Sequence, residues 1–171
     1  PEVLTALFPP RKTAGPVDGD DRLRDILIPV DGKVCVGARF HMAHADRPSI
    51  LFFHGNGEIV SDYDDIGPLF NRLGINFMVV DYRGYGRSSG SPSVSAMMHD
   101  AHVILDFVLQ WLEEKGFSRE RLKDVFTPIG TPLGAESPEE IAISIVSELV
   151  CVRRKGKAQA RALRAAVGIE L

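Results

Sequence analysis

The sequence has few cysteines, no long apolar run and no large excess of charge of either sign. Its two cysteines, Cys35 and Cys151, lie far apart in unrelated contexts, which favours a reduced, cytoplasmic protein. No apolar run approaches the roughly 20 residues that a membrane-spanning helix needs, and the N-terminal stretch lacks the long apolar core of a signal peptide. A formal net charge of −3 gives no reason to expect nucleic acid or an anionic membrane as a partner.

The 171 residues are enough for one domain with a sizeable core. Residues 1–22 are rich in Pro, Gly and Asp and predict an irregular arm. Residues 23–118 alternate between strand and helix patterns, whereas residues 119–155 contain no long apolar run that would predict a buried strand. Residues 156–171 form a tail that is basic first and Ala-rich later. We therefore expect four segments with these boundaries.

The order of the elements predicts an α/β fold. Two β-rich runs on either side of Asp31 and Gly32 predict a hairpin. Residues 49–53 are nearly continuously apolar, which predicts a strand in the middle of a sheet, and residues 75–82 predict a second buried strand. Helical spacing appears before Gly74 and throughout residues 93–116. We expect a partial, mainly parallel sheet with flanking helices, and a C-terminal helix.

The stretch FFHGNGE places small residues directly after a predicted strand. Such a turn can present free backbone N–H groups at the carboxyl edge of a sheet, and an oxyanion hole needs donors of this kind. The N–H of Asn56 is the candidate donor, with Gly55 and Gly57 giving the backbone its freedom. The alternative is a simple turn after a strand, because Gly and Asn often occur in turns.

A second stretch, VVDYRGYGRSSGSP, follows about thirty residues later. Together the two stretches resemble the α/β-hydrolase fold family, in its serine-hydrolase branch of small esterases and peptidase-like members. That family has an H-G-x-G turn after its third strand and a D-x-R-G-x-G-x-S loop after its fourth, and the resemblance covers residues 23–116. It implies a small ester or amide substrate. The motif residues here are His54, Gly55, Gly57, Asp81, Gly84, Gly86 and Ser88.

The letters GRSSG match the G-x-S-x-G pattern of a nucleophile elbow, with Ser88 in the central position. An elbow places its serine on a tight turn between a buried strand and a helix. Here the apolar run ends at Val80, and Ser88 follows eight residues later, with a loop after Gly90. The resemblance puts Ser88 after the fourth strand, one strand too early. We therefore interpret the loop as structural, shaping the rim of the site.

The partners of a catalytic serine are also missing from their expected places. The family's triad runs Ser, then Asp or Glu, then His, from successive strand ends. After Ser88 the only histidines are His99 and His102, inside the long predicted helix, and the others precede the serine. We expect His99 and His102 to be partly exposed helix residues. The sequence predicts no catalytic residue, metal or cofactor, and hence a catalytically incomplete hydrolase-like protein.

The stretch TPIGTPLGAESPEEIAISIVSELVCVRRKG differs from a hydrolase. Residues 121–155 resemble the end of the xanthine dehydrogenase accessory protein family, XdhC or CoxI. The resemblance implies a Rossmann-like domain and a role in loading a molybdenum cofactor, but a G-x-G dinucleotide loop has no good counterpart. The matching residues are Pro128, Ile129, Gly130, Leu133, Gly134, Ala135, Ser137, Pro138, Glu139, Glu140, Ile141, Ala142, Ser144 and Ile145.

The alternative for this stretch is simply a helix with a good start signal. Ser137 is the expected N-cap, and Glu140 completes a capping box. The expected apolar stripe of the helix consists of Ile141, Ile145, Leu149 and Val152.

We expect a fusion of two incomplete parts, and three functional hypotheses follow. The first is an active hydrolase with the Asn56 N–H as oxyanion donor and Ser88 as the serine to test. The second is a non-catalytic scaffold or interaction protein, and the third is an accessory role through the C-terminal segment. An apolar sheet edge left unpaired would also permit a homo-oligomer. The acidic stretch SDYDDIG lacks the glycine and distal glutamate of a calcium loop, and we expect a solvated helix start.

Overall fold

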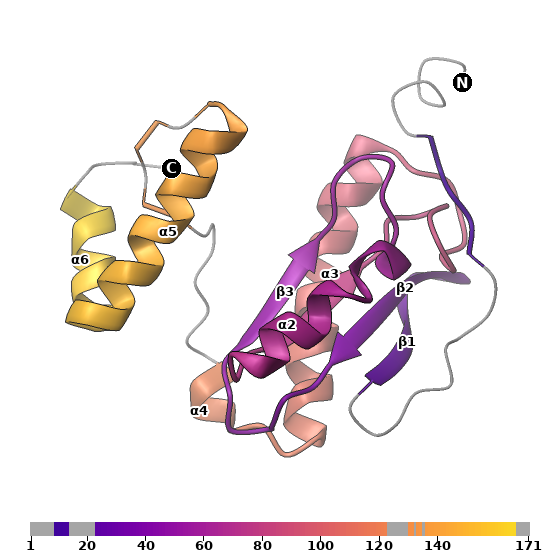
Figure 1. Cartoon of the computed structure of the whole chain (residues 1–171). Coiled ribbons are helices and arrows are strands. Elements are labelled where there is room, and N and C mark those ends of the chain that lie inside the picture. The colour runs from indigo at the N-terminus through magenta and orange to yellow at the C-terminus, as the bar shows by residue number, and fades with distance from the viewer. Residues whose placement is uncertain (1–8, 14–22, 123–129, 132, 135, 167–171) are drawn as a thin grey trace. The chain divides into compact units, whose positions relative to one another are not determined.

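The computed structural model describes residues 9–13, 23–122, 130–131, 133–134 and 136–166. The chain divides into two compact units, Pro1–Lys123 and Asp124–Leu171 (Figure 1), and each is described by itself. The finer segment boundaries at residues 22, 118 and 155 remain a prediction. Within the described residues, no helix combines the length and the apolar character that a membrane crossing requires.

A four-stranded sheet forms the centre of the first unit, in the order β1-β2-β4-β3. Its strands are β1 (Leu23–Asp31), β2 (Val34–His41), β3 (Ser49–Phe53) and β4 (Asn76–Val80). The α/β class and the predicted hairpin are confirmed, since β1 and β2 pair antiparallel around a turn where Gly32 has φ 51°. The sheet is mixed, because β2 and β4 also pair antiparallel and only β3 and β4 are parallel. It therefore holds less parallel pairing than the sequence led us to expect.

The expected central position of residues 49–53 is wrong. β3 is the last strand of the sheet and is half-buried along most of its length, whereas every residue of β4 is buried. An apolar strand indicates that its two faces are covered, and it says nothing about whether both of its edges are paired. The strand in the interior of the sheet is β4, which lies between β2 and β3.

Helices cover both faces of the sheet, as predicted. α3 (Val94–Glu114) packs on one face, and η1 (Val60–Tyr63) and α2 (Ile66–Arg72) pack on the other (Figure 1). Side chains alternate along a strand, so Met78 and Val80 enter the core under α3, while Phe77 and Val79 pack against Val60. Ser93 caps α3 by accepting from the N–H of Ala96 at 3.2 Å. The short α4 (Arg119–Leu122) follows it.

A buried ion cluster holds the loop after β4 to the hairpin. The guanidinium of Arg39, only 3% exposed, donates to both carboxylate oxygens of Asp25, at 2.6 and 2.9 Å, and to Asp64 at 2.5 Å. Arg87 from the loop donates to the same Asp25 at 3.1 Å. The hydrogen bonds that Arg39 donates to Asp25 outweigh the effect of burial and raise the pKa of Arg39 above its usual value. The acidic stretch is therefore not simply solvated, because Asp64 pairs with an arginine.

The second unit contains α5 (Pro138–Lys155) and α6 (Lys157–Ala166). The predicted capping box is present: Ser137 Oγ accepts from the N–H of Glu140 at 3.3 Å, and Glu140 accepts in return at 3.0 Å. The predicted apolar stripe is wrong in part, because Ile141 and Leu149 are 46% and 53% exposed. Of the residues that resemble the accessory family, Pro128, Ile129 and Ala135 lie outside the described residues.

Polar contacts build the buried side of α5. Ser144 Oγ donates to the carbonyl of Thr131 at 2.5 Å, and the Glu148 carboxylate accepts from the N–H of Gly130 at 2.6 Å. Arg164 of α6 lies 3.4 Å from the other oxygen of Glu148. Periodicity identified an amphipathic helix, but its buried residues include Ser144 and Glu148, which lie outside the predicted stripe and hydrogen-bond to residues 130–131.

Candidate functional site

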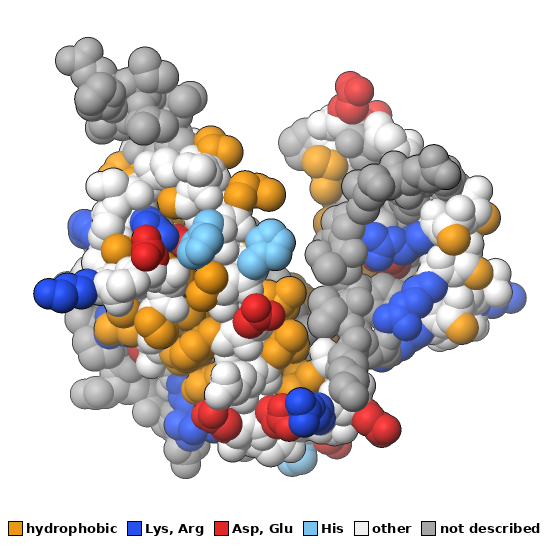
Figure 2. Space-filling view, turned by 180° about the vertical axis from the view of Figure 1, so that it is seen from behind, with side chains coloured by type: hydrophobic (Ala, Val, Ile, Leu, Met, Phe, Trp, Pro, Cys, Tyr) orange, Lys and Arg blue, Asp and Glu red, His pale blue; other side chains and the backbone are white. Residues whose placement is uncertain are grey.

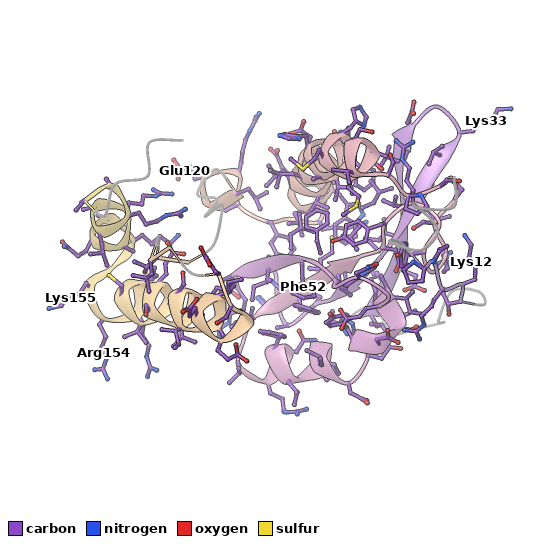
Figure 3. All side chains as sticks on the ribbon, turned by 90° about the horizontal axis from the view of Figure 1, so that it is seen from above. Lys12, Lys33, Phe52, Glu120, Arg154 and Lys155 are labelled. Carbon is purple, nitrogen blue, oxygen red and sulfur yellow. The ribbon has the colours of Figure 1, made fainter. Side chains whose placement is uncertain are left out.

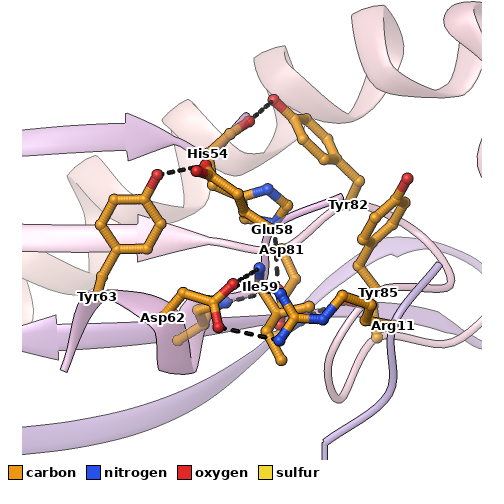
Figure 4. A network of polar contacts seen from close by, with 12 residues as sticks. Arg11, His54, Glu58, Ile59, Asp62, Tyr63, Asp81, Tyr82 and Tyr85 are labelled. Atoms are coloured by element: carbon orange, nitrogen blue, oxygen red, sulfur yellow. Dashed lines mark hydrogen bonds and ion pairs between the residues drawn. The ribbon is translucent and has the colours of Figure 1, made fainter. Parts of the chain in front are cut away.

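The two motifs meet at the carboxyl ends of β3 and β4. These neighbouring parallel strands are in register, with Phe53 opposite Val80, so His54 and Asp81 follow at the same edge of the sheet. The Nε2 atom of His54 lies 3.2 Å from Oδ1 of Asp81, and both residues are buried (Figure 4). The other ring nitrogen, Nδ1, lies 2.9 Å from the carbonyl oxygen of Gly55. Both nitrogens of this imidazole therefore face oxygen atoms other than a serine hydroxyl.

Asp81 connects three segments. Besides His54, its Oδ1 accepts a hydrogen bond from the N–H of Val60 at the start of η1, at 3.0 Å. Its second oxygen lies against Gly86, where an added Cβ would stand 2.0 Å from Oδ2. Gly86 also has φ 47°, a conformation that favours glycine. The first part of the loop motif thus encloses a carboxylate rather than exposing one.

The hydroxyl of Ser88 points into the protein. Ser88 is 2% exposed, and its Oγ accepts a hydrogen bond from the N–H of Gly37 in β2 at 2.9 Å. Its own N–H donates to the carbonyl of Tyr85 at 2.7 Å, and its carbonyl accepts from Lys12 Nζ at 2.7 Å. The serine that matches the elbow pattern is therefore held at three points and joins the loop to the sheet.

The same loop is tied to α3. Arg83 forms two hydrogen bonds with the carboxylate of Asp100, both of 2.7 Å. Burial alone would raise the pKa of Asp100, but hydrogen bonds from Arg83 and His99 outweigh it and place that pKa below its usual value. Gly84, with φ 83°, turns the chain next to this contact, and its N–H donates to the carbonyl of Ser89 at 3.1 Å.

The turn after β3 binds one of its own side chains. The N–H of Gly55 donates to Oε2 of Glu58 at 2.7 Å, and the hydroxyl of Tyr63 donates to the same oxygen at 2.6 Å (Figure 4). Burial, together with the hydrogen bond to Glu58, raises the pKa of Tyr63. The backbone donor one residue before the predicted one, Asn56, is thus occupied by a carboxylate, which is the kind of group that oxyanion-hole donors bind.

Asn56 lies in this turn, and its side-chain oxygen accepts from the hydroxyl of Tyr85 at 3.1 Å. Gly57 has φ 83° and open space where a Cβ would be. Tyr82 donates to the carbonyl of His54 at 2.9 Å, and burial raises the pKa of its hydroxyl. The oxyanion role of the Asn56 N–H stays a prediction.

The N-terminal arm also reaches this site. Arg11 donates to both carboxylate oxygens of Asp62, at 2.6 and 3.1 Å, and to the carbonyl of Gly57 at 3.1 Å. Hydrogen bonding from Arg11 lowers the pKa of Asp62, which also accepts from the N–H of Ile59 at 3.0 Å. Neither this pair nor the role of Glu58 was predicted from the sequence. Glu58 could have been noticed as the acidic residue that ends HGNGE. No local pattern connects Arg11 with Asp62, which lies 51 positions further along the chain.

None of the other four histidines is hydrogen-bonded to Ser88. His99 and His102 lie on α3, where His99 contacts Asp100 at 3.1 Å and His102 contacts the carbonyl of Met98 at 2.9 Å. His41 is buried, which lowers its pKa, and its Nε2 has no hydrogen-bond partner. Within the described ranges, no group of three or more His, Cys, Asp or Glu side chains is arranged to hold a metal ion.

Comparisons with known proteins fall on the same two segments. The family model of serine aminopeptidase, S33, matches residues 44–117, and the model of the XdhC Rossmann domain matches residues 105–149. The first match contains both motifs at the strand ends. The second begins within α3 and continues through most of α5, so it starts earlier than the resemblance inferred from the sequence.

Individual relatives share only part of the chain. Protein bem46 of Schizosaccharomyces pombe is 34% identical over 65 residues, covering 37% of this chain and 22% of that protein. The lysophosphatidylserine lipase ABHD12 of Gallus gallus is 36% identical over 66 residues, covering 37% and 17%. The chain thus spans about a fifth of these relatives. Among solved structures, the carboxylesterase EstE1 from a metagenomic library is 26% identical, covers 67% of this chain and 37% of its own, and has a TM-score of 0.46.

Proposed function

We propose, on the premise that residues 44–117 belong to the α/β-hydrolase family, that this chain is a hydrolase-derived scaffold or interaction protein without serine-hydrolase activity. The observation that carries the proposal is the hydrogen bond from the Gly37 N–H to the Ser88 hydroxyl, at 2.9 Å, in a residue that is 2% exposed. A nucleophile has to reach a substrate carbon and pass its proton to a base. The buried hydroxyl of Ser88 can reach neither a substrate nor a base.

The histidines support the same conclusion. All five lie within the described residues, and none has a hydrogen bond to Ser88 in this structure. His54 belongs to the first motif, and its Nε2 is directed at Asp81. Activation of a serine requires an imidazole within hydrogen-bond reach. The pair of His54 and Asp81 therefore acts, in this proposal, as a structural link between two strand ends.

Glu58 gives a second line of support. An oxyanion hole stabilises charge that develops on the substrate, so its donors must be open to the substrate. The Gly55 N–H donates to Glu58, and Tyr63 holds that carboxylate from the other side. A substrate oxygen at this donor would have to displace an anion of the protein itself. The turn is then closed at the Gly55 N–H, one residue before the predicted donor Asn56.

Activity-based labelling tests the proposal directly. The full chain is treated with a fluorophosphonate probe and assayed with a p-nitrophenyl ester, beside the Ser88→Ala variant and the matched control Ser95→Ala at the start of α3. We expect no labelling and no burst from any of the three. Labelling of the wild-type chain that is lost only in Ser88→Ala would overturn the proposal. It would restore an active hydrolase acting on a small ester or amide.

A second candidate function rests on the match of residues 105–149 to the XdhC Rossmann domain. Its basis is the resemblance to an accessory family that assists molybdenum cofactor loading, and the capped helix α5 is its best-formed part. The test is binding of molybdopterin or of a molybdenum hydroxylase by the full chain. Binding that is lost when the α5 helix cap is removed by Ser137→Ala with Glu140→Ala would support it. An absence of binding to either would remove it.

The proposed setting is a reducing one. Cys35 and Cys151 are both free thiols and lie in different units. Cytoplasmic localisation is therefore part of the proposal, and fractionation of cells that express the chain would test it. Recovery mainly with an oxidising compartment would contradict it.

A further inference from the structure

α5 presents an apolar stripe that nothing covers within the described part of the second unit. Ile143, Val146 and Val150 are 60%, 56% and 53% exposed. Together with Ala142 and Ser147 they line a shallow hollow on the helix. Exposed hydrophobic side chains are visible on the second unit as well as on the first (Figure 2). Three exposed apolar side chains that adjoin one another on one helix make this side of α5 a candidate interaction surface.

The stripe has the spacing of a helix–helix seam. Glu139, Ile143, Val146, Val150 and Arg153 are separated by four, three, four and three residues. This alternation keeps all five on one side of a helix and is the repeat by which paired helices interlock. The opposite side of α5 carries the buried Ser144 and Glu148. The seam is therefore free to face a partner while α5 remains packed on its own unit.

The charges at the two ends of the seam indicate which partner fits. The first turn of α5 carries Glu139 and Glu140, and its last turn carries Arg153, Arg154 and Lys155. Arg154 and Lys155 lie at the C-terminal end of the helix (Figure 3). A second α5 in antiparallel orientation would place each acidic end beside a basic end. A parallel arrangement would place like charges together, which is unfavourable.

The two charged ends of the seam are equally far from its middle, because Glu139 and Arg153 each lie seven residues from Val146. A two-fold axis at Val146 would therefore bring Glu139 of one copy opposite Arg153 of the other. The same axis would place Ile143 opposite Leu149 and Val150 opposite Ala142. The small Ala142 and Ser147 leave room for larger side chains of the facing helix, as interlocked packing requires.

We infer that two copies of this chain associate through α5, antiparallel, around a two-fold axis at Val146. Eighteen residues give a seam of about 27 Å. One helix pair buries less area than a standard stable interface, so the dimer forms reversibly as the protein concentration rises. This surface lies on α5, whereas the sequence predicts a possible oligomer contact at an unpaired apolar edge of the sheet.

Disulfide trapping tests the geometry. In the full chain with Cys35→Ser and Cys151→Ser, Val146→Cys brings two thiols together across the proposed axis. We expect a covalent dimer under mild oxidation. The control Gln159→Cys places a thiol on the exposed surface of α6 and is expected to remain monomeric. Equal crosslinking of the two variants, or none with Val146→Cys, would overturn the inference.

A charge exchange tests the orientation without relying on the apolar contacts. We expect Glu139→Arg to weaken dimerisation about three- to tenfold, measured by sedimentation, because it places like charges together at both ends of the seam. Adding Arg153→Glu in the same chain should restore the wild-type affinity. Both changes oppose the helix dipole of α5, so recovery cannot come from a more stable helix. Failure of the double variant to recover overturns the antiparallel arrangement.

Val146→Glu separates this surface from all others. Two carboxylates at the axis should make the chain monomeric at concentrations where the wild type is dimeric. Circular dichroism and the unfolding midpoint show whether the variant keeps its fold, as expected for a residue that is 56% exposed. A dimer that survives Val146→Glu lies elsewhere, at the edge of β3 for example, and overturns the inference. A wild-type chain that is monomeric at every concentration does the same.

Discussion

The Oδ1 atom of Asp81 lies 3.2 Å from Nε2 of His54, at the ends of two adjacent parallel strands. The same oxygen accepts from the N–H of Val60, so one buried atom fixes the turn after β3, the start of η1 and the end of β4. In a loop that carries the letters of a catalytic motif, the buried carboxylate is thus engaged in holding the fold. This arrangement leads to predictions about stability rather than turnover.

Replacing Asp81 should be costly. Asp81→Ala leaves the N–H of Val60 and the His54 ring without their acceptor in the interior, at about 1 to 3 kcal/mol for each unpaired group. We expect a loss of about 3 kcal/mol in the free energy of unfolding, measured in urea. Asp81→Asn keeps an oxygen at this position and should lose about half as much. Equal losses for the two variants would show that the acceptor is unimportant.

Gly86 should tolerate no side chain. Its φ of 47° disfavours any other residue, and a Cβ would stand 2.0 Å from Oδ2 of Asp81. Gly32 is a matched control, since its φ is 51° and nothing lies within 4 Å of its Cβ position. We expect Gly32→Ala to lose about 1 kcal/mol of unfolding free energy and Gly86→Ala to lose at least about 2 kcal/mol more. Thermal and urea unfolding of the two variants measure the difference, and similar losses would contradict the packing argument.

Much of the first unit could be predicted because its signals are local. The hairpin at Gly32, the strands at residues 49–53 and 76–80 and the helix after Ser93 each follow from short patterns that the structure confirms. The position of Ser88 could be judged from its distance to Val80 along the chain. The spacing placed it in a loop, and in the structure its hydroxyl faces β2.

What could not be predicted depends on contacts between distant residues or on the choice between two surfaces. Arg11 and Asp62 are paired across 51 positions, and no local pattern connects them. The edge position of β3 depends on which strands pair with one another. The sequence of β3 indicates only that both of its faces are apolar. In α5 both faces carry apolar residues. The face with Ser144 and Glu148 is the buried one, because both side chains form hydrogen bonds there.

The pairing of Arg83 with Asp100 should make stability depend on pH. The pKa of Asp100 is lowered in the folded chain, so the unfolded chain binds the proton more readily. The stabilisation is therefore present above the unfolded pKa of about 3.9 and is lost as the pH falls through the lower folded value. We expect wild type to exceed Asp100→Asn in unfolding free energy at pH 7, and the difference to shrink below pH 4.

Urea unfolding at pH 7, 5 and 3 measures this difference. Asp106→Asn, which changes an exposed carboxylate on the same helix, is the control and should show a much smaller difference at every pH. If the difference in unfolding free energy between wild type and Asp100→Asn stays constant down to pH 3, the ion pair is not its source.

Glu58 should control the ionisation of Tyr63. Burial and the hydrogen bond to Glu58 both raise the pKa of this hydroxyl. In Glu58→Ala the acceptor and its negative charge are gone, so the pKa of Tyr63 should fall towards its ordinary value of about 10. The same change releases the N–H of Gly55, whose amide resonance should move and should respond to added acetate or phosphate, unlike in the wild type.

Nuclear magnetic resonance of the tyrosine ring carbons measures the ionisation, with Tyr63→Phe to assign the signal. Glu113→Ala, an exposed carboxylate on α3, is the control and should leave both signals unchanged. If Glu58→Ala shifts neither the Tyr63 titration nor the Gly55 amide, the carboxylate does not occupy this donor in solution. The turn after β3 would then be open to an external anion, and the case against an oxyanion site in this chain would lose its second support.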